Sequence, residues 1–257
     1  MPSKTHENIR RIVRVGLLIA LAVVVRNLSY MLYIGGIPAL RLGFSEIFTK
    51  IAAILFGPLY GGISSGILDV LGFLLAGGAY GPYIPWLTII AVLGGIITGL
   101  LWIMVGKIDF TKAGRYYLVI FAAFGLIGGI NYLFLSLWPE SGLSVFLKQI
   151  GENMSFATLG LEIIAAVGIG LFLINIVLRK INKKWIVHDD FMKILIATGV
   201  SGLIVSTLNT LVIAEMGNIN FLILWIPRII KEVFMVIIQA YIIAYLISIY
   251  RKYLAKV

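Results

Sequence analysis

Four polar residues stand out because they lie within or beside long apolar stretches of the sequence. They are Arg41, Asp69, Asn209 and Arg228. An ionisable side chain at membrane depth costs about 2.5–3.5 kcal/mol on insertion scales, so each charged residue there needs a partner or a function. The planar guanidinium of arginine binds carboxylates and phosphates through two parallel hydrogen bonds. The set therefore suits a small anionic ligand.

Asp69 is spaced to share one helical face with small residues. Gly61, Ser65, Asp69 and Gly72 follow one another at intervals of three or four positions, which places them on the same side of a helix. One interpretation is a polar group that lines a cavity. The other is a helix that packs closely through its small residues, with Asp69 bonded to a neighbouring helix or paired with an arginine.

Arg41 and Arg228 are expected on the extracytoplasmic side, at the ends of apolar stretches. Arg228 follows Pro227, which we expect at the start of a helix. Each arginine could instead extend to lipid headgroups, and Arg228 could pair with Glu232 one helical turn later. Extension to headgroups is the commoner role for a single arginine. Because both arginines lie beside aromatic, Gly- and Pro-rich loops, a ligand-anchoring role becomes nearly as well supported.

Aromatic and amide side chains near the same membrane surface extend the candidate site. Tyr83 and Trp86 lie in a segment with three glycines and two prolines at 76–86, which indicates either an aromatic belt at the interface or a movable flap. Asn209 lies near the outer end of its apolar stretch. Its amide could hydrogen-bond a ligand or simply another helix.

The composition excludes whole classes of protein. Of the 257 residues, 61% are hydrophobic and 12% are charged, against roughly 45–50% and 25% in soluble domains. A soluble enzyme and a disordered chain are both excluded by these values. The absence of cysteine excludes disulfides, a thiol nucleophile and Cys-ligated metal sites. The lipid bilayer is therefore the solvent in which this chain folds.

Eight apolar stretches are candidates for membrane helices, which need about 20 residues to cross the hydrocarbon core. The second is short and joins the third through a Gly-Pro turn, so the number of spans is seven if its arm enters obliquely. In chain order the stretches are Val13–Tyr33, Glu46–Phe56, Leu59–Ala76, Pro85–Val105, Tyr116–Leu137, Phe156–Leu178, Lys193–Ala214 and Pro227–Tyr250.

Basic residues sort to one side of these stretches. Fifteen of the 21 Lys and Arg residues fall in the two terminal segments and in two connecting segments, Lys107–Arg115 and Arg179–Lys193. The positive-inside rule then predicts that both termini are cytoplasmic. The net charge of +10 is therefore explained by topology, and nucleic acid is excluded as a partner because the charges are scattered.

Motifs for autonomous chemistry are missing from the sequence. There is no P-loop for ATP, no run of acidic or histidine residues for a proton relay and no inverted repeat. His6 and His188 lie outside the apolar stretches, so we expect no metal, no cofactor and no enzymatic activity. A stand-alone secondary transporter or channel for a small solute is the alternative, while a lipid-modifying enzyme would need a catalytic constellation that is absent.

Several segments, in order, resemble the substrate-binding (S) component of energy-coupling factor (ECF) vitamin transporters, and specifically the folate-type branch. The resemblance covers residues 13–102 and 194–246. It rests on the stretches Gly16-Leu-Leu-Ile-Ala20, Leu40-Arg41-Leu-Gly43-Phe44-Ser45, Leu55-Phe56-Gly57-Pro58, Gly66-Ile-Leu-Asp69-Val-Leu-Gly72, Gly81-Pro82-Tyr83, Pro85-Trp86-Leu-Thr88, Leu208-Asn209-Thr210-Leu211 and Pro227-Arg228-Ile-Ile-Lys231, with Gln239.

The resemblance implies an all-α integral membrane protein with a single membrane domain over residues 1–257. A six-helix S-component core would occupy 13–106 and 193–250. Residues 110–190 would add an inserted pair of transmembrane helices, which the family does not usually have.

The resemblance also implies a function and partners. The chain would be the vitamin-binding subunit of an ECF-type ABC importer in the cell membrane, taking up folate or another small anionic vitamin-like compound. An ECF coupling protein and two ATP-binding-cassette ATPases would supply the energy.

Gly16 and Ala20 would form the small-residue surface that docks on the coupling protein. The loops at 33–45 and 76–85 would gate the site. The candidate substrate-binding residues are Arg41, Asp69, Tyr83, Trp86, Asn209 and Arg228.

Overall fold

The computed structural model describes residues 4–34, 37–76, 82–107 and 187–254, together with single positions between 122 and 140 and between 166 and 177. The four ranges contain six helices, two strands and a terminal π-helical turn. These are α1 (Lys4–Arg26), β1 (Tyr30–Ile34), β2 (Ile37–Leu42), α2 (Glu46–Phe56), α3 (Pro58–Leu75), α4 (Pro85–Val105), α8 (Val187–Gly217), α9 (Phe221–Ile249) and η1 (Tyr250–Leu254).

Four segments in the described ranges are long and apolar enough to cross a membrane. They are Pro58–Leu75, Pro85–Val105, Asp190–Gly217 and Phe221–Lys252. This finding confirms the predicted class, an integral membrane protein built of helices. The predicted pair of helices at 110–190 lies outside the described residues except for single positions and the start of α8, so the division into core and insertion stays a prediction.

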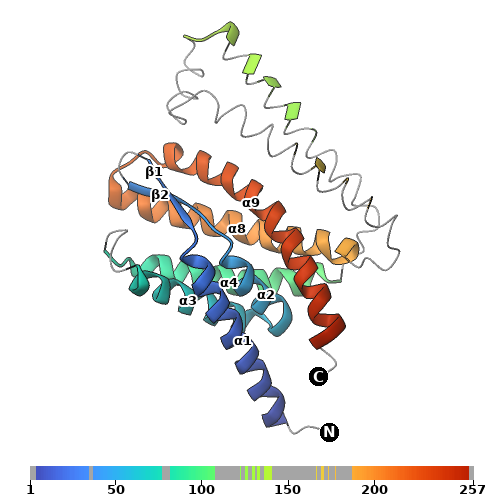
Figure 1. The fold of residues 1–257 in the computed structure, drawn as a ribbon. Coiled ribbons are helices and arrows are strands. Elements are labelled where there is room, and N and C mark those ends of the chain that lie inside the picture. Colours follow the sequence, from blue (N-terminus) through green and yellow to red (C-terminus); the bar gives the residue numbers. More distant parts are fainter. Residues whose placement is uncertain are drawn as a thin grey trace.

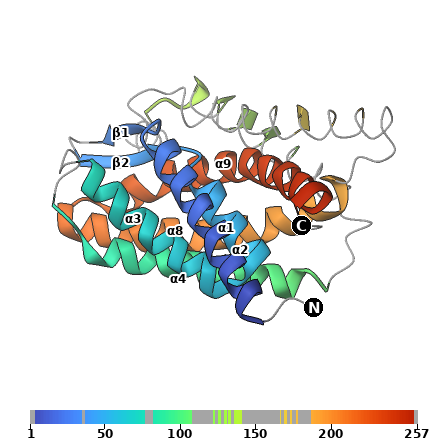
Figure 2. The same ribbon diagram turned by 60° about the horizontal axis from the view of Figure 1, so that its bottom comes forward.

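The helices pack in the order α3, α4, α8, α9, and the most extensive contacts join these neighbours. Figure 1 shows α1 crossing α2 and α3, with the β1–β2 hairpin near one end of the bundle. The start of α1 and the end of α9 lie at the opposite end from the hairpin, and the turned view in Figure 2 agrees. Both ends of the described chain therefore lie on the same side of the bundle.

Buried isoleucines hold α2 between its neighbours. Ile47, Ile51 and Ile54 recur along one face of α2 at intervals of three or four and pack against buried residues of α8 and α9. Helix α2 has only 11 residues. Its position is nevertheless fixed, because its buried face packs into the core. This short helix is the second apolar stretch, the one whose arm could enter the membrane obliquely.

Helix α1 ends earlier than predicted. The sequence predicts a helix up to Tyr33, whereas the structure ends it at Arg26 and forms β1 from Tyr30. The Ser29 hydroxyl donates to the Arg26 carbonyl at 2.6 Å, which satisfies one of the carbonyls left open at the helix end. The aromatic and aliphatic residues that follow pair with β2 in an antiparallel hairpin, Tyr30 opposite Leu42, so tertiary pairing overrides continuation of the helix.

Helix α9 begins earlier than predicted. Pro227 suggests a first turn because it lacks an N–H group, but it lies inside the helix. The start is at Phe221, where the Asn220 side chain accepts a hydrogen bond from the Leu222 backbone N–H at 2.9 Å. This N-cap satisfies a donor that the helix would otherwise leave open, and it places Arg228 two turns inside the helix.

Glycines allow α3 and α4 to lie close together. A Cβ atom on Gly61 would lie 2.6 Å from the Gly95 carbonyl oxygen, and a Cβ on Gly95 would collide with the Gly61 backbone. Small residues at such crossings let helix backbones approach, and in lipid this packing is a main source of association. The α3–α4 contact is therefore specified by residues that lack side chains.

We predict that Gly61→Ala destabilises the protein, because the methyl group would force apart two backbones that cannot move independently. Overpacking of this kind costs about 1–3 kcal/mol. Thermal unfolding of the detergent-purified protein measures the effect. Gly199→Ala is the matched control, since its Cβ would lie 3.4 Å from Val236, an ordinary contact. Equal melting temperatures for the two variants would contradict the prediction.

Candidate functional site

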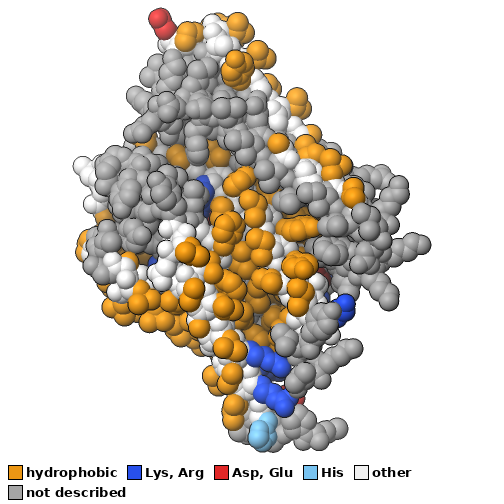
Figure 3. Space-filling view, in the orientation of Figure 1, with side chains coloured by type: hydrophobic (Ala, Val, Ile, Leu, Met, Phe, Trp, Pro, Cys, Tyr) orange, Lys and Arg blue, Asp and Glu red, His pale blue; other side chains and the backbone are white. Residues whose placement is uncertain are grey.

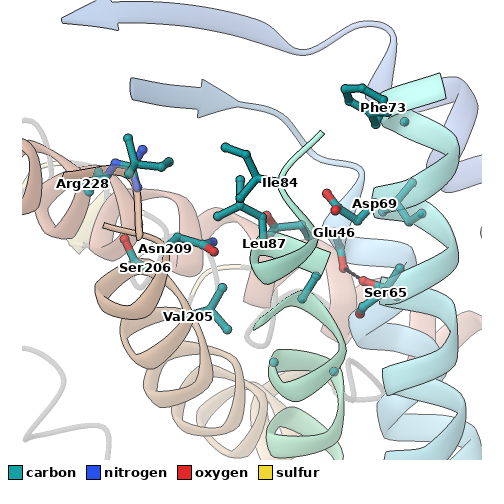
Figure 4. A pocket seen from close by; sticks show the side chains of 18 of the residues that line it. Glu46, Ser65, Asp69, Phe73, Ile84, Leu87, Val205, Ser206, Asn209 and Arg228 are labelled. Atoms are coloured by element: carbon teal, nitrogen blue, oxygen red, sulfur yellow. Dashed lines mark hydrogen bonds between the residues drawn. The ribbon is translucent and has the colours of Figure 1, made fainter. Parts of the chain in front are cut away.

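A cavity of about 560 Å³ opens between the helices, lined by residues of α1, α2, α3, α4, α8 and α9 and by the segment before α4. Figure 4 shows two polar walls facing each other: Asp69 and Ser65 on α3, and Ser206, Asn209 and Arg228 on α8 and α9. Ile84, Leu87 and Val205 also line the cavity. The cavity can therefore hold a ligand with polar groups at both ends and an apolar centre.

Four of the six predicted substrate-binding residues line this cavity. They are Asp69, Tyr83, Asn209 and Arg228. Trp86 is not among the lining residues, and it is 64% exposed. Arg41 lies in β2, and its side chain is outside the described part of the structure. The binding role of all six stays a prediction.

On the first wall, Asp69 is held by two partners. Its carboxylate pairs with the Arg26 guanidinium at 3.3 Å and accepts a hydrogen bond from the Thr88 hydroxyl at 2.7 Å. Thr88 also contacts the Tyr83 hydroxyl at 2.7 Å. Asp69 therefore satisfies both earlier interpretations, since it pairs with an arginine and lines a cavity.

Arg26 lines the cavity although it was not among the site residues predicted from the sequence. Its guanidinium also donates to the Leu68 carbonyl at 3.0 Å, and it lies against Gly72, where any Cβ would meet it. The available signal was an arginine within the first predicted apolar stretch, Val13–Tyr33. Only the fold shows that it meets the Asp69 face.

On the second wall, Arg228 is 7% exposed, which is incompatible with a side chain that merely extends to lipid headgroups. Its guanidinium donates to the Thr210 hydroxyl at 3.4 Å. Glu232, the partner considered from the sequence, forms an ion pair with Lys231 at 3.0 Å. Both Lys231 and Glu232 also line the cavity.

A third polar group, also missed, lies on α2. Lys50 is 7% exposed and lines the cavity together with Glu46. Its ammonium lies 3.2 Å from the Glu46 carboxylate and donates to the Gln239 side-chain oxygen at 2.7 Å. A lysine within the second apolar stretch was the available signal, but its partner Gln239 is 189 positions away.

The charges of the cavity do not cancel. Among the described residues, four cationic side chains and three carboxylates line it, namely Arg26, Lys50, Arg228 and Lys231 against Glu46, Asp69 and Glu232. A concave surface with low-dielectric walls focuses such an excess of charge and attracts ligands of the opposite sign. The cavity therefore suits a ligand with a net negative charge.

Some buried polar atoms of the lining have no hydrogen-bond partner among the described residues, and two of them lie on Arg26 and Asn209. These two are Nε of Arg26, a donor, and Oδ1 of Asn209, an acceptor. A buried polar group without a partner costs about 1–3 kcal/mol. A ligand that hydrogen-bonds to both atoms would remove this cost, which would favour its binding. Within the described part of the chain, no group of three or more acidic or histidine side chains gathers to hold a metal ion.

The two predicted docking residues lie on the surface of α1. Gly16 and Ala20 are exposed, and no atom lies within 4 Å of a Cβ built on Gly16. Leu17, Leu21 and Val24 of the same helix are more than half exposed. Figure 3 shows apolar side chains gathered over this side of the molecule, with basic side chains nearer the start of the helix.

Comparisons with known proteins agree with this architecture. Residues 10–159, more than half of the chain, match the family model described as "ECF transporter, substrate-specific component". A stretch of 62 residues is 37% identical to the folate transporter FolT of Clostridium novyi (strain NT). That match covers 24% of this chain and 35% of the relative. No solved structure matches the chain.

We predict that Arg26 and Asp69 stabilise the empty protein mainly through each other. Arg26→Gln or Asp69→Asn alone leaves one charge in a partly buried site, whereas the double variant removes both charges. Thermal unfolding should show that the double variant loses less stability than the sum of the two single variants. Additive losses would mean that the pair contributes little.

Proposed function

Because this chain belongs to the family of substrate-specific components of ECF transporters, we propose that it captures folate or another small anionic vitamin-like compound from outside the cell. As a member of this family it is a vitamin-binding membrane subunit and not an enzyme. The single observation that carries the proposed ligand class is the cavity with one more cation than carboxylates. The local similarity to a folate transporter supports the choice of folate as the first candidate.

Within the cavity, we assign the anionic end of the ligand to Arg228. A buried guanidinium can give directional, charge-assisted hydrogen bonds to a ligand, whereas a lipid-facing arginine would form them with headgroups. Asn209 would hydrogen-bond the ligand next to it, since its Oδ1 has no described partner. Asp69, fixed by Arg26 and Thr88, would accept from N–H groups at the opposite end.

The remaining predicted residues would complete the site from the outer side. Tyr83 packs on Phe73 with ring centroids 5.0 Å apart, so its ring offers a fixed aromatic wall. Trp86, which is exposed, and Arg41 on the hairpin would contribute when the outer segments move onto the ligand.

Transport would require partners, since the sequence contains no ATP-binding motif. We propose that α1 docks through Gly16 and Ala20 on an ECF coupling protein, which acts with two ATP-binding-cassette ATPases. Small exposed residues within an apolar stretch of a helix allow the close backbone approach that such contacts use. The distribution of basic residues supports cytoplasmic termini, and the start of α1 and end of α9 lie on one side of the bundle.

We predict that the detergent-purified protein binds folate without ATP, measured by calorimetry within a panel of vitamins. Arg228→Gln should weaken binding about tenfold or more, because it removes a charge-assisted hydrogen bond. Arg251→Gln is the control: Arg251 pairs with Asp190 near the end of α9 and does not line the cavity. The ligand assignment fails if no member of the panel gives heat, or if both variants bind like the wild type.

We predict that Gly16→Leu or Ala20→Leu blocks uptake by the assembled transporter while leaving ligand affinity unchanged, because a bulky side chain would hold the coupling protein away from α1. Uptake into liposomes that contain the whole complex measures this. Val200→Leu, on an exposed position of α8, is the control and should transport normally. Ion-driven uptake by this protein alone would favour the alternative, a stand-alone secondary transporter.

A further inference from the structure

Gln239 joins the cavity to the β1–β2 hairpin without lining the cavity itself. It lies on α9 and is 3% exposed. Its side-chain oxygen accepts a hydrogen bond from the Lys50 ammonium at 2.7 Å, and its side-chain nitrogen donates to the Gly43 carbonyl at 3.5 Å. One amide therefore contacts both α2 and the residue that follows β2.

Lys50 is the group through which Gln239 reaches the ligand. Its ammonium has three N–H donors, and the contacts to Glu46 and Gln239 use two of them. Because Lys50 lines the cavity, the third donor suits an anionic group bound there. A lysine side chain is a flexible stem with a point charge, so the direction of the ammonium depends on its partners.

Gly43 lies at the base of the hairpin. It follows β2 and precedes α2, and a Cβ built on it would lie 2.8 Å from Cβ of Ser29. Ser29 in turn precedes β1 and bonds back to the end of α1. The two chain segments that enter and leave the hairpin therefore touch at Gly43, where Gln239 donates its hydrogen bond.

We propose that Gln239 is a positioning residue, which directs the Lys50 ammonium toward the anionic group of the ligand and fixes the base of the β1–β2 hairpin to that ammonium. The inference rests on the proposed ligand-binding role of the cavity. The hydrogen bonds run from ligand to Lys50, to Gln239 and to Gly43, so loss of Gln239 weakens anion binding and loosens the hairpin together. Loss of Lys50 weakens binding but leaves the bond from Gln239 to Gly43.

The test compares Gln239→Met, Lys50→Met and the double variant. Methionine matches the length of both side chains and removes their hydrogen bonds. Thr198→Val is the control, because Thr198 is fully buried and donates to the Ile194 carbonyl of its own helix, and it is not among the described residues that line the cavity. If Gln239→Met does not fold, Gln239→Asn is the second variant. It keeps the amide oxygen and nitrogen, but its stem is too short to bridge Lys50 and Gly43.

Folate affinity and release rate form the first measurement. Each single variant should weaken folate binding about tenfold, with most of the change in the release rate. The double variant should bind no worse than Lys50→Met, because Gln239 acts through Lys50. Wild-type affinity in Gln239→Met, or additive losses in the double variant, would overturn the inference.

Hairpin mobility in the ligand-free protein forms the second measurement. The chain has no cysteine, so a spin label on Phe44→Cys reports on the residue next to Gly43. Phe44 is 42% exposed and accepts a label without repacking the core. The label should become more mobile in Gln239→Met but not in Lys50→Met or Thr198→Val. Unchanged mobility of the label in Gln239→Met would overturn the inference. Because the measurement uses the ligand-free protein, it tests the role of Gln239 at the hairpin even if the wild type fails to bind folate.

Discussion

Among the described residues, seven ionisable side chains line the cavity of a bundle whose outer surface is apolar. The site depends on the pairing of these side chains with one another. Arg26 pairs with Asp69, Lys50 with Glu46 and Lys231 with Glu232. A charge taken out of water without a partner would cost several kcal/mol. These pairs keep the cavity polar while the helices around it pack, and the described part of the lining carries one more cationic side chain than carboxylates.

Small residues determine where the cavity lies. Gly61 and Gly95 bring α3 and α4 into backbone contact, and Gly72 and Gly202 leave room for the charged ends of Arg26 and Glu232. A methyl group at either of the latter positions would meet the charged group. The glycines therefore have two functions in this S component, since they close the helix contacts and accommodate the long charged side chains that line the cavity.

The elements were predictable wherever local signals agreed. Helices α2 and α4 have the predicted bounds, because Gly and Pro interrupt the chain at their ends. The predictions for the end of α1 and the start of α9 were wrong. Apolar residues continue past Arg26, but strand pairing ends α1 there. Pro227 is a common first residue of a helix, but the Asn220 cap starts α9 earlier.

By itself, the sequence determined the solvent, the helical class and four of the spans, because these follow from composition and hydropathy along the chain. It also identified Asp69, Asn209 and Arg228 as costly groups that need a role. Only the tertiary structure decided that Arg26 meets Asp69 across 43 positions and that Lys50 meets Gln239 across 189. No periodicity encodes such pairs, because helix packing alone fixes the distance between side chains on different helices.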